Sequence, residues 1–227
     1  MNEKELSEII HKYNHEVGNP LTAIISLSSL LTQLLPKEEE KNLEFLQIII
    51  NEAWKINSLS ESLLYLLSQR SSKSESDIRS ALKKSLSKLE QRYLLDINRV
   101  QIEGEADSEV QIELEQLSYI FSELIFNGFI ENLLDPTHTI MITIENAEDQ
   151  INIQIKNRIT TDRSIDYLKI REPLLADRPN QKRLGLGLAA VDAIIKRSEN
   201  SLNLFEEVNN NNRFFVANLE LKKIQSL

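Results

Sequence analysis

The sequence predicts an α+β protein in which an N-terminal helical hairpin precedes a two-layer α/β sandwich. Through the first 70 residues, apolar side chains recur at alternating spacings of four and three, which is the heptad pattern of helices that pack together. After a polar stretch at 71–77, alternating strand patterns appear among shorter helical ones. We therefore expect a helical domain at 1–70, a linker at 71–77 and an α/β domain at 78–227.

The composition excludes several classes of protein. The chain has 227 residues, 41% of them hydrophobic, which is enough for a buried core. Its net charge of −9 argues against nucleic acid as a partner, because duplex binders are usually basic. It has no cysteine and three histidines, which excludes disulfides and thiol catalysis and makes a His-rich metal centre implausible. No segment is apolar enough for a membrane span and no signal-peptide profile is present, so we expect a cytoplasmic protein.

Two heptad seams define the helical hairpin. The first ends before Pro36 and the charged run at 37–40, where the chain is expected to turn. A single hairpin leaves its apolar seam uncovered, so we expect two copies to meet as a four-helix bundle, which implies a homodimer. The first seam comprises Leu6, Ile10, Tyr13, Val17, Pro20, Ile24, Leu27, Leu31 and Leu34, and the second Leu46, Ile49, Ala53, Ile56, Ser60, Leu63 and Leu67.

The α/β domain is expected to contain three helices and five strands. Asp77 is the expected N-cap of the first helix, and the segment 158–183 is expected to be irregular and basic. The expected helices span 78–93, 112–132 and 187–197, and the strands include 98–103, 140–144, 151–155, 202–204 and 215–219 with a turn at 209–212.

His15 is expected on the side of the first helix that faces away from the seam. Asn19 and Thr22 follow it at four and seven residues, so all three share one solvent-facing stripe. Pro20 lies inside this helix and removes the hydrogen bond to the carbonyl of Glu16. A proline in a helix interior costs about 3 kcal/mol, which indicates that this segment has a functional role.

The segment His15-Glu16-Val17-Gly18-Asn19-Pro20-Leu21-Thr22-Ala23-Ile24 closely resembles the H-box of two-component sensor histidine kinases. The resemblance implies that His15 is the phosphoacceptor and that Asn19 orients a water for dephosphorylation. A neutral imidazole held by a carboxylate presents its other nitrogen as a nucleophile, and Glu16 is the natural carboxylate. The alternative is an exposed histidine on an amphipathic helix, which is how we interpret His11.

Residues from 78 onward resemble the ATP-binding domain shared by histidine kinases, gyrase and the heat-shock chaperone of the same fold. The segment 123–128 resembles the N-box, with Asn127 at the magnesium-chelating position and Glu123 where kinases usually carry another asparagine. Gly185 and Gly187 resemble the second glycine box, whose amides open a helix and approach phosphate oxygens. The resemblance therefore implies ATP and Mg as cofactors. An ordinary amphipathic helix and close helix packing are the alternative explanations of these two motifs.

The first glycine box departs from the family pattern Asp-x-Gly-x-Gly. Asn157 takes the place of the aspartate that accepts a hydrogen bond from the adenine amino group, so its carbonyl would accept without charge assistance. Ile159 and Thr161 replace the two glycines, and Arg183 replaces the first glycine of the second box. The segment 171–175 resembles an F-box that has lost its aromatic residues, and the basic residues of 158–183 are either an ATP lid or a solvated loop.

Three functions are compared with these motifs. The first is a sensor-less histidine kinase that autophosphorylates His15 from ATP and passes the phosphoryl group to an aspartate of a response regulator receiver domain. The second is a histidine phosphotransferase, derived from a kinase that no longer binds ATP, which moves the group between aspartates through His15. The third is a non-catalytic dimeric binding module, which does not explain the H-box. Glu16 and Asn127 favour the kinase, whereas the altered first glycine box favours the phosphotransferase.

Overall fold

The computed structural model describes residues 19, 21–35, 40–67, 74–93, 95–106, 108–131, 137–160, 165–171, 186–210 and 212–224. The chain divides into two compact units, Met1–Gln69 and Arg70–Leu227. Each unit is described by itself below. Within the described residues, no helix combines the length and apolar composition that a membrane crossing requires.

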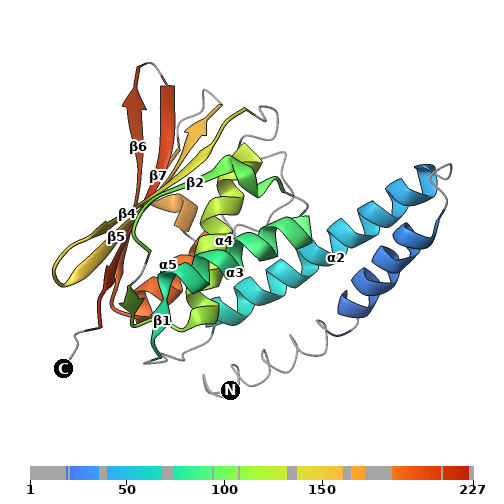
Figure 1. Ribbon diagram of the computed structural model, residues 1–227, viewed down its shortest axis with the longest axis horizontal. Coiled ribbons are helices and arrows are strands. Elements are labelled where there is room, and N and C mark those ends of the chain that lie inside the picture. Colours follow the sequence, from blue (N-terminus) through green and yellow to red (C-terminus); the bar gives the residue numbers. More distant parts are fainter. Residues whose placement is uncertain are drawn as a thin grey trace. The chain divides into compact units, whose positions relative to one another are not determined.

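The first unit is helical, as predicted. Residues 21–34 form a helix, and the chain then reverses into α2, Glu40–Leu67 (Figure 1). Most of the described seam side chains are exposed in the single chain, and Leu34 reaches 69%. An amphipathic helix gains its stability by burying its apolar face, so this seam needs another apolar surface to pack against it. The first seam predicts a helix from residue 3, and residues 3–18 lie outside the described residues. Asn19 and residues 21–34, which belong to the same predicted helix, are helical.

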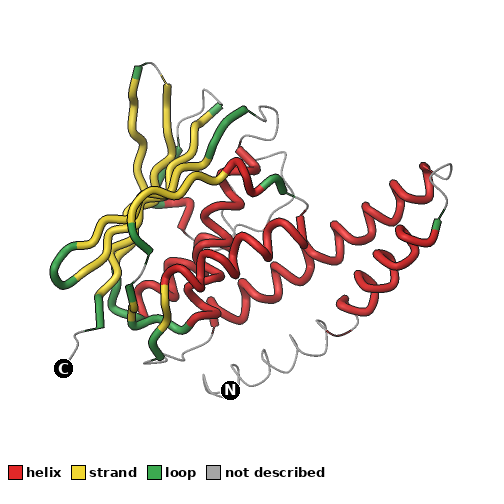
Figure 2. Tube along the Cα trace, in the orientation of Figure 1, coloured by secondary structure: helices red, strands yellow, loops and turns green. Residues whose placement is uncertain are grey.

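The second unit is a mixed sheet with helices on one face, which confirms the predicted α+β fold (Figures 1 and 2). The sheet has the order β2-β4-β5-β7-β6, with β2 and β4 parallel and the other neighbours antiparallel. The helices are α3 (Ile78–Tyr93), α4 (Leu114–Glu131) and α5 (Gly187–Arg197). The strands are β1 (Ser76–Asp77), β2 (Val100–Gly104), β3 (Glu109–Val110), β4 (Ile140–Asn146), β5 (Gln150–Ile159), β6 (Ser201–Asn209) and β7 (Asn212–Lys222).

Alternating isoleucines build the core of the sheet. Ile144 pairs with Ile153, and Ile153 pairs in turn with Leu219 on β7, so these side chains share one face. All three are at most 4% exposed. Burial on one face fixes the register, because a slip by one residue would turn every one of these side chains toward the other face.

The start of α3 agrees with the predicted cap, but the linker is shorter than expected. The Ser80 amide donates to Asp77 Oδ2 at 2.8 Å, as an N-cap requires. Ser76 and Asp77, which we had assigned to the linker, form β1 and pair with β3. Ser76 is buried and its hydroxyl donates to the Ile112 carbonyl at 2.6 Å. A strand of two residues is too short to show an alternating pattern of apolar and polar side chains. The polar composition of 71–77 therefore indicated a linker and not a strand.

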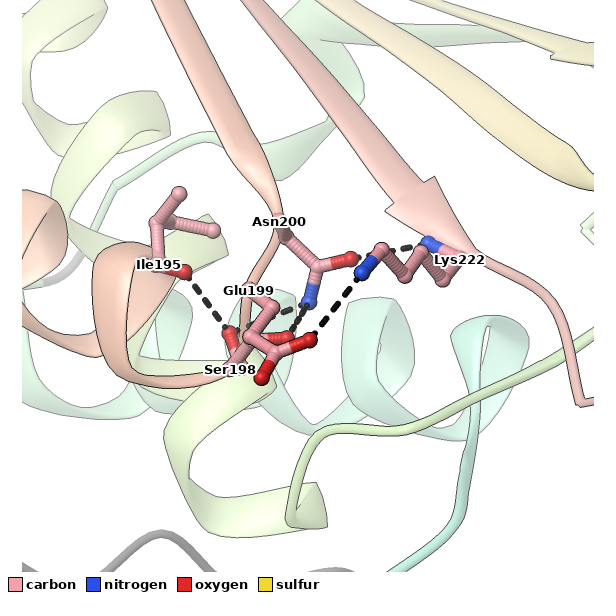
Figure 3. A network of polar contacts seen from close by, with 5 residues as sticks. All are labelled: Ile195, Ser198, Glu199, Asn200 and Lys222. Atoms are coloured by element: carbon pink, nitrogen blue, oxygen red, sulfur yellow. Dashed lines mark hydrogen bonds and ion pairs between the residues drawn. The ribbon is translucent and has the colours of Figure 1, made fainter.

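A network of polar contacts fixes the C-terminal end of α5 against β7 (Figure 3). The Asn200 amide bonds to the Ile195 carbonyl at 3.1 Å, and Glu199 has a φ of 55°, which together make a Schellman-type end. The Asn200 side chain donates to the Ser198 carbonyl at 3.0 Å and accepts from the Lys222 amide at 2.8 Å. These contacts attach the C-terminal end of α5 to the last strand.

Candidate functional site

The described part of the H-box segment has the predicted exposed stripe. Asn19 and Thr22 are exposed, whereas Leu21 between them is 7% exposed. His15 and Glu16 lie outside the described residues, so their roles remain predictions from the sequence.

Helix α4 presents two polar side chains through an otherwise buried surface. Between residues 116 and 129, Glu123 and Asn127 are half-buried and every other residue is buried. The two are four residues apart and therefore lie on the same side of the helix, one turn from each other. The two N-box residues singled out in the sequence thus form a single accessible window in this part of α4.

Helix α5 begins directly against Glu123. A Cβ built on Gly187, the first residue of α5, would lie 3.1 Å from Glu123 Cδ and nearer still to Oε2. Glycine leaves room for the Glu123 carboxylate in this position, and any larger residue would displace it. We call Glu123, Asn127 and Gly187 the α4–α5 corner. Gly185, the other predicted phosphate-binding glycine, lies outside the described residues.

Asn157 lies beneath α4, on the sheet. A Cβ on Gly128 would be 3.2 Å from Asn157 Cβ and 2.9 Å from Ile140 Cδ1, so α4 contacts β4 and β5 directly at this glycine. Asn157 is 3% exposed, and its Nδ2 donates to the Arg158 carbonyl at 3.2 Å. The structure therefore brings Asn157 next to the residue that follows Asn127.

The altered first glycine box is part of a continuous strand. Asn157 pairs with Phe215 and Ile159 with Arg213, so the β5–β7 ladder continues to the end of β5. Ile159 is 5% exposed and packs in the interior. The expected irregular segment therefore begins later than residue 158. Residues 157–159 lack the glycines that would turn the chain, and β-branched isoleucine favours extended backbone.

A group of four side chains that the sequence analysis missed holds the segment 165–168 on the sheet. The Tyr167 ring stacks on Phe215 with centroids 6.0 Å apart, and its hydroxyl donates to Glu206 Oε2 at 3.3 Å. Arg213 donates to both Glu206 oxygens, at 2.6 and 2.8 Å. We call these residues the Tyr167 cluster. Tyr167 lies 39 or more positions before the other three and the four belong to no motif, so no local signal indicates its contact with them.

Arg171, a member of the basic segment 158–183, is half-buried against α5 and β6. Its Nη1 donates to the Leu202 carbonyl at 2.9 Å and approaches Asp192 Oδ1 at 3.5 Å. Its Nε is buried without a hydrogen-bond partner in the described part of the chain. Arg171 is therefore a structural link between this segment, α5 and β6. Four further basic residues of the predicted lid, Arg163, Arg178, Lys182 and Arg183, lie outside the described residues.

Two protein families match the chain. The His Kinase A (phospho-acceptor) domain matches residues 5–72, and the GHKL domain matches residues 112–222. The chain has the two domains of a histidine kinase catalytic core. The match in the first domain covers the H-box segment, and the match in the second covers the α4–α5 corner of this histidine kinase core.

Solved structures share the fold of this histidine kinase core at low identity. A mycobacterial sensor histidine kinase, MprB, is 12% identical over 67% of this chain and 99% of its own, with a TM-score of 0.53. The catalytic domain of the histidine kinase ThkA is 17% identical over 66% of this chain and 95% of its own, with a TM-score of 0.50. Full-length ShkA in complex with AMPPNP is 14% identical over 96% of this chain and 47% of its own, with a TM-score of 0.63. No curated protein sequence matches the chain.

No metal cluster of acidic or histidine side chains is present in the part of the chain that the structure describes. The predicted magnesium ligand, Asn127, is a neutral amide oxygen donor, and hard cations such as Mg²⁺ take such oxygens together with phosphate and water. The magnesium position therefore stays a prediction that depends on a bound nucleotide.

The Tyr167 cluster predicts a specific response to acid. Hydrogen bonding from Arg213 lowers the pKa of Glu206 below its ordinary 4.5. Because the charged form is favoured in the folded chain, the pair contributes stability above the ordinary pKa and loses it as the pH falls through the lowered value. In carbon-detected NMR titrations, we expect Arg213→Gln to raise the pKa of the Glu206 carboxyl toward 4.5. Tyr167→Phe should raise it less, and an unchanged pKa in Arg213→Gln would contradict this account.

Proposed function

We propose that this protein is a two-component histidine kinase that autophosphorylates His15 from ATP and passes the phosphoryl group to an aspartate of a response regulator receiver domain. The observation that carries the proposal is the α4–α5 corner, where Glu123 and Asn127 are accessible on one side of α4 and the Glu123 carboxylate lies against the glycine that starts α5. We further propose a cytoplasmic location, where ATP and receiver domains are available.

The residues present fit the phosphate end of a nucleotide better than its base end. Asn127 would provide an oxygen to Mg²⁺, and the amides at the start of α5, with Gly185 and Gly187, would contact phosphate oxygens. Asn157 would accept from the base through its carbonyl, without a charge. Bound ATP would supply the transferable phosphoryl group. His15 would act as the nucleophile, Glu16 would hold its imidazole, and Asn19 would orient a water for dephosphorylation.

A second candidate is a histidine phosphotransferase that does not use ATP. The continuous β5–β7 ladder favours it, because residues 157–159 stay in the sheet where a base-binding turn would leave it. Both candidates use His15 in the same way and differ only in the source of the phosphoryl group.

We also propose that the protein acts as a homodimer through the helices of the first unit. The apolar seam supports this, because Ile24, Leu27, Leu31 and Leu34 are each at least 43% exposed in one chain. Burying each such side chain contributes about 1.5–3 kcal/mol. A second copy of the hairpin offers a matching seam, which would complete a four-helix bundle.

His15→Gln should abolish all acid-labile phosphorylation, whatever the donor, while the circular dichroism spectrum stays that of the wild type. A solvent-facing position explains the unchanged fold, and the loss follows from removing the nucleophilic nitrogen. His11→Gln is the matched control and should keep the wild-type level. Phosphohistidine in His15→Gln would show that another residue is the acceptor.

Leu27→Glu should raise the dissociation constant of the dimer by at least about tenfold, because each copy would bury an uncompensated charge at the seam. Sedimentation of the full chain measures this directly. Leu168→Glu is a suitable control, since Leu168 is 79% exposed in the second unit and lies outside the seam. A wild-type chain that stays monomeric at micromolar concentration would refute the dimer.

Asn127→Asp should separate the kinase from the phosphotransferase. In a kinase, this change should eliminate labelling of His15 from ATP and spare transfer from a phosphorylated receiver domain, which needs only the helical unit. In a phosphotransferase, the wild type itself should show no saturable binding at millimolar ATP and should still be labelled by the receiver. Saturable ATP binding by the wild type would eliminate the second candidate.

A further inference from the structure

Two large apolar side chains of the first unit lie outside both heptad seams and are exposed. Leu30 is 50% exposed and Phe45 is 62% exposed in the single chain. Each comes directly before a seam residue that starts a heptad, Leu31 or Leu46, so both occupy the heptad position g. The g position flanks the apolar core of a seam and is commonly charged. A partner that covers only the seams would leave these two side chains in water.

The opposite flank of each seam is already covered within the chain. Leu21 and Ser28 occupy position e of the first helix and Ile50 occupies position e of α2, and all three are at most 9% exposed. The chain reverses between these helices, so the helix 21–34 and α2 run in opposite directions (Figure 1). In two antiparallel helices the e flanks face each other, and so do the g flanks. The hairpin therefore uses its e flanks internally and leaves its g flanks for another molecule.

Leu30 and Phe45 lie at the same height above the turn of the hairpin. Leu30 is five residues before Leu35, and Phe45 is five residues after Glu40, where α2 begins. At about 1.5 Å per residue, each is about 7.5 Å from its own end of the turn. A two-fold axis along the bundle sets the turns of both copies side by side, so that Leu30 of one copy faces the partner's Phe45. With the turns at opposite ends, these apolar flanks would not meet.

We propose that Leu30 of one copy packs against the partner's Phe45, twice in each dimer, and that this pair places both turns at the same end of the bundle. The occupant of the exposed g flank is a second copy of the chain, because the flank is continuous with the seam and complementary to itself under two-fold symmetry. The inference rests on the dimer of the proposed function and is independent of the phosphoryl donor.

The apolar g contact is confined to the turn end of the bundle. The next g positions away from the turn are Ala23 and Glu52, which offer no second apolar pair. The Glu52 side chain is 60% exposed and pairs with Lys55 of its own helix at 2.5 Å. Leu30 and Phe45 are therefore the residues whose substitution tests the arrangement.

Cross-linking of single cysteines tests the contact directly, since the chain has no cysteine of its own. Full-length Leu30→Cys and Phe45→Cys chains are mixed, allowed to exchange subunits and treated with a short bismaleimide. We expect covalent dimers that join residue 30 to residue 45, several-fold more than with either variant alone. Ser29→Cys is the matched control, because position f is one residue away and lies off the g flank. Equal cross-linking of Ser29→Cys with Phe45→Cys would overturn the proposal, as would a dimer in which residues 30 and 45 do not cross-link.

Sedimentation of charge variants gives a second measurement. Leu30→Glu should raise the dissociation constant of the dimer at least about fivefold, because two apolar contacts are lost per dimer. The double variant Leu30→Glu/Phe45→Lys should dimerise more tightly than Leu30→Glu alone, since each contact then joins opposite charges. An equal or weaker dimer of the double variant would contradict a direct contact. A dimeric wild type that fails these tests overturns only this pairing, whereas a monomeric wild type overturns the dimer as well. Phosphorylation of His15 is measured separately.

Discussion

The missing side chain at Gly128 sets the distance between α4 and the sheet, and the candidate site depends on that distance. An added Cβ would lie 2.9 Å from Ile140 Cδ1 and 3.2 Å from Asn157 Cβ, so even alanine would force either these side chains or α4 to shift. A shift of α4 would carry Glu123 and Asn127 with it and change their position relative to Gly187. One packing contact in the core therefore positions polar groups on two helices and a strand.

The sequence predicted the elements whose side-chain pattern repeats over several turns or pairs. The start of α5 at Gly187, the isoleucine faces of β4 and β5 and the cap at Asp77 all follow from local periodicity and local hydrogen bonding. The strands β1 and β3 are too short to have a period. The Tyr167 cluster joins Tyr167 to residues 39 and 48 positions further along the chain, and only the completed sheet brings them together.

The candidate site was predicted in part for the same reason. Its helical residues, Glu123, Asn127 and Gly187, come from two motifs that the sequence displays, and the structure brings them to one corner. Its strand residue, Asn157, was also identified, but the effect of losing the glycines became clear only from the register of β5 and β7. The α4–α5 corner depends on helix packing, whereas the end of β5 depends on backbone pairing. A sequence change in one of these two parts therefore leaves the other intact.

The continuous strand at residues 157–159 also makes the present sequence hard to reverse in evolution. Ile159 fills part of the core, and its replacement by glycine would cost several kcal/mol of stability from the lost side chain and the more flexible backbone. That loss would occur at once, whereas any gain in base binding would require the other substitutions of the glycine box as well. A lineage that acquires this ladder therefore has no route of single, individually tolerated steps back to the turn. The extended strand therefore favours retention of the altered glycine box once it has appeared.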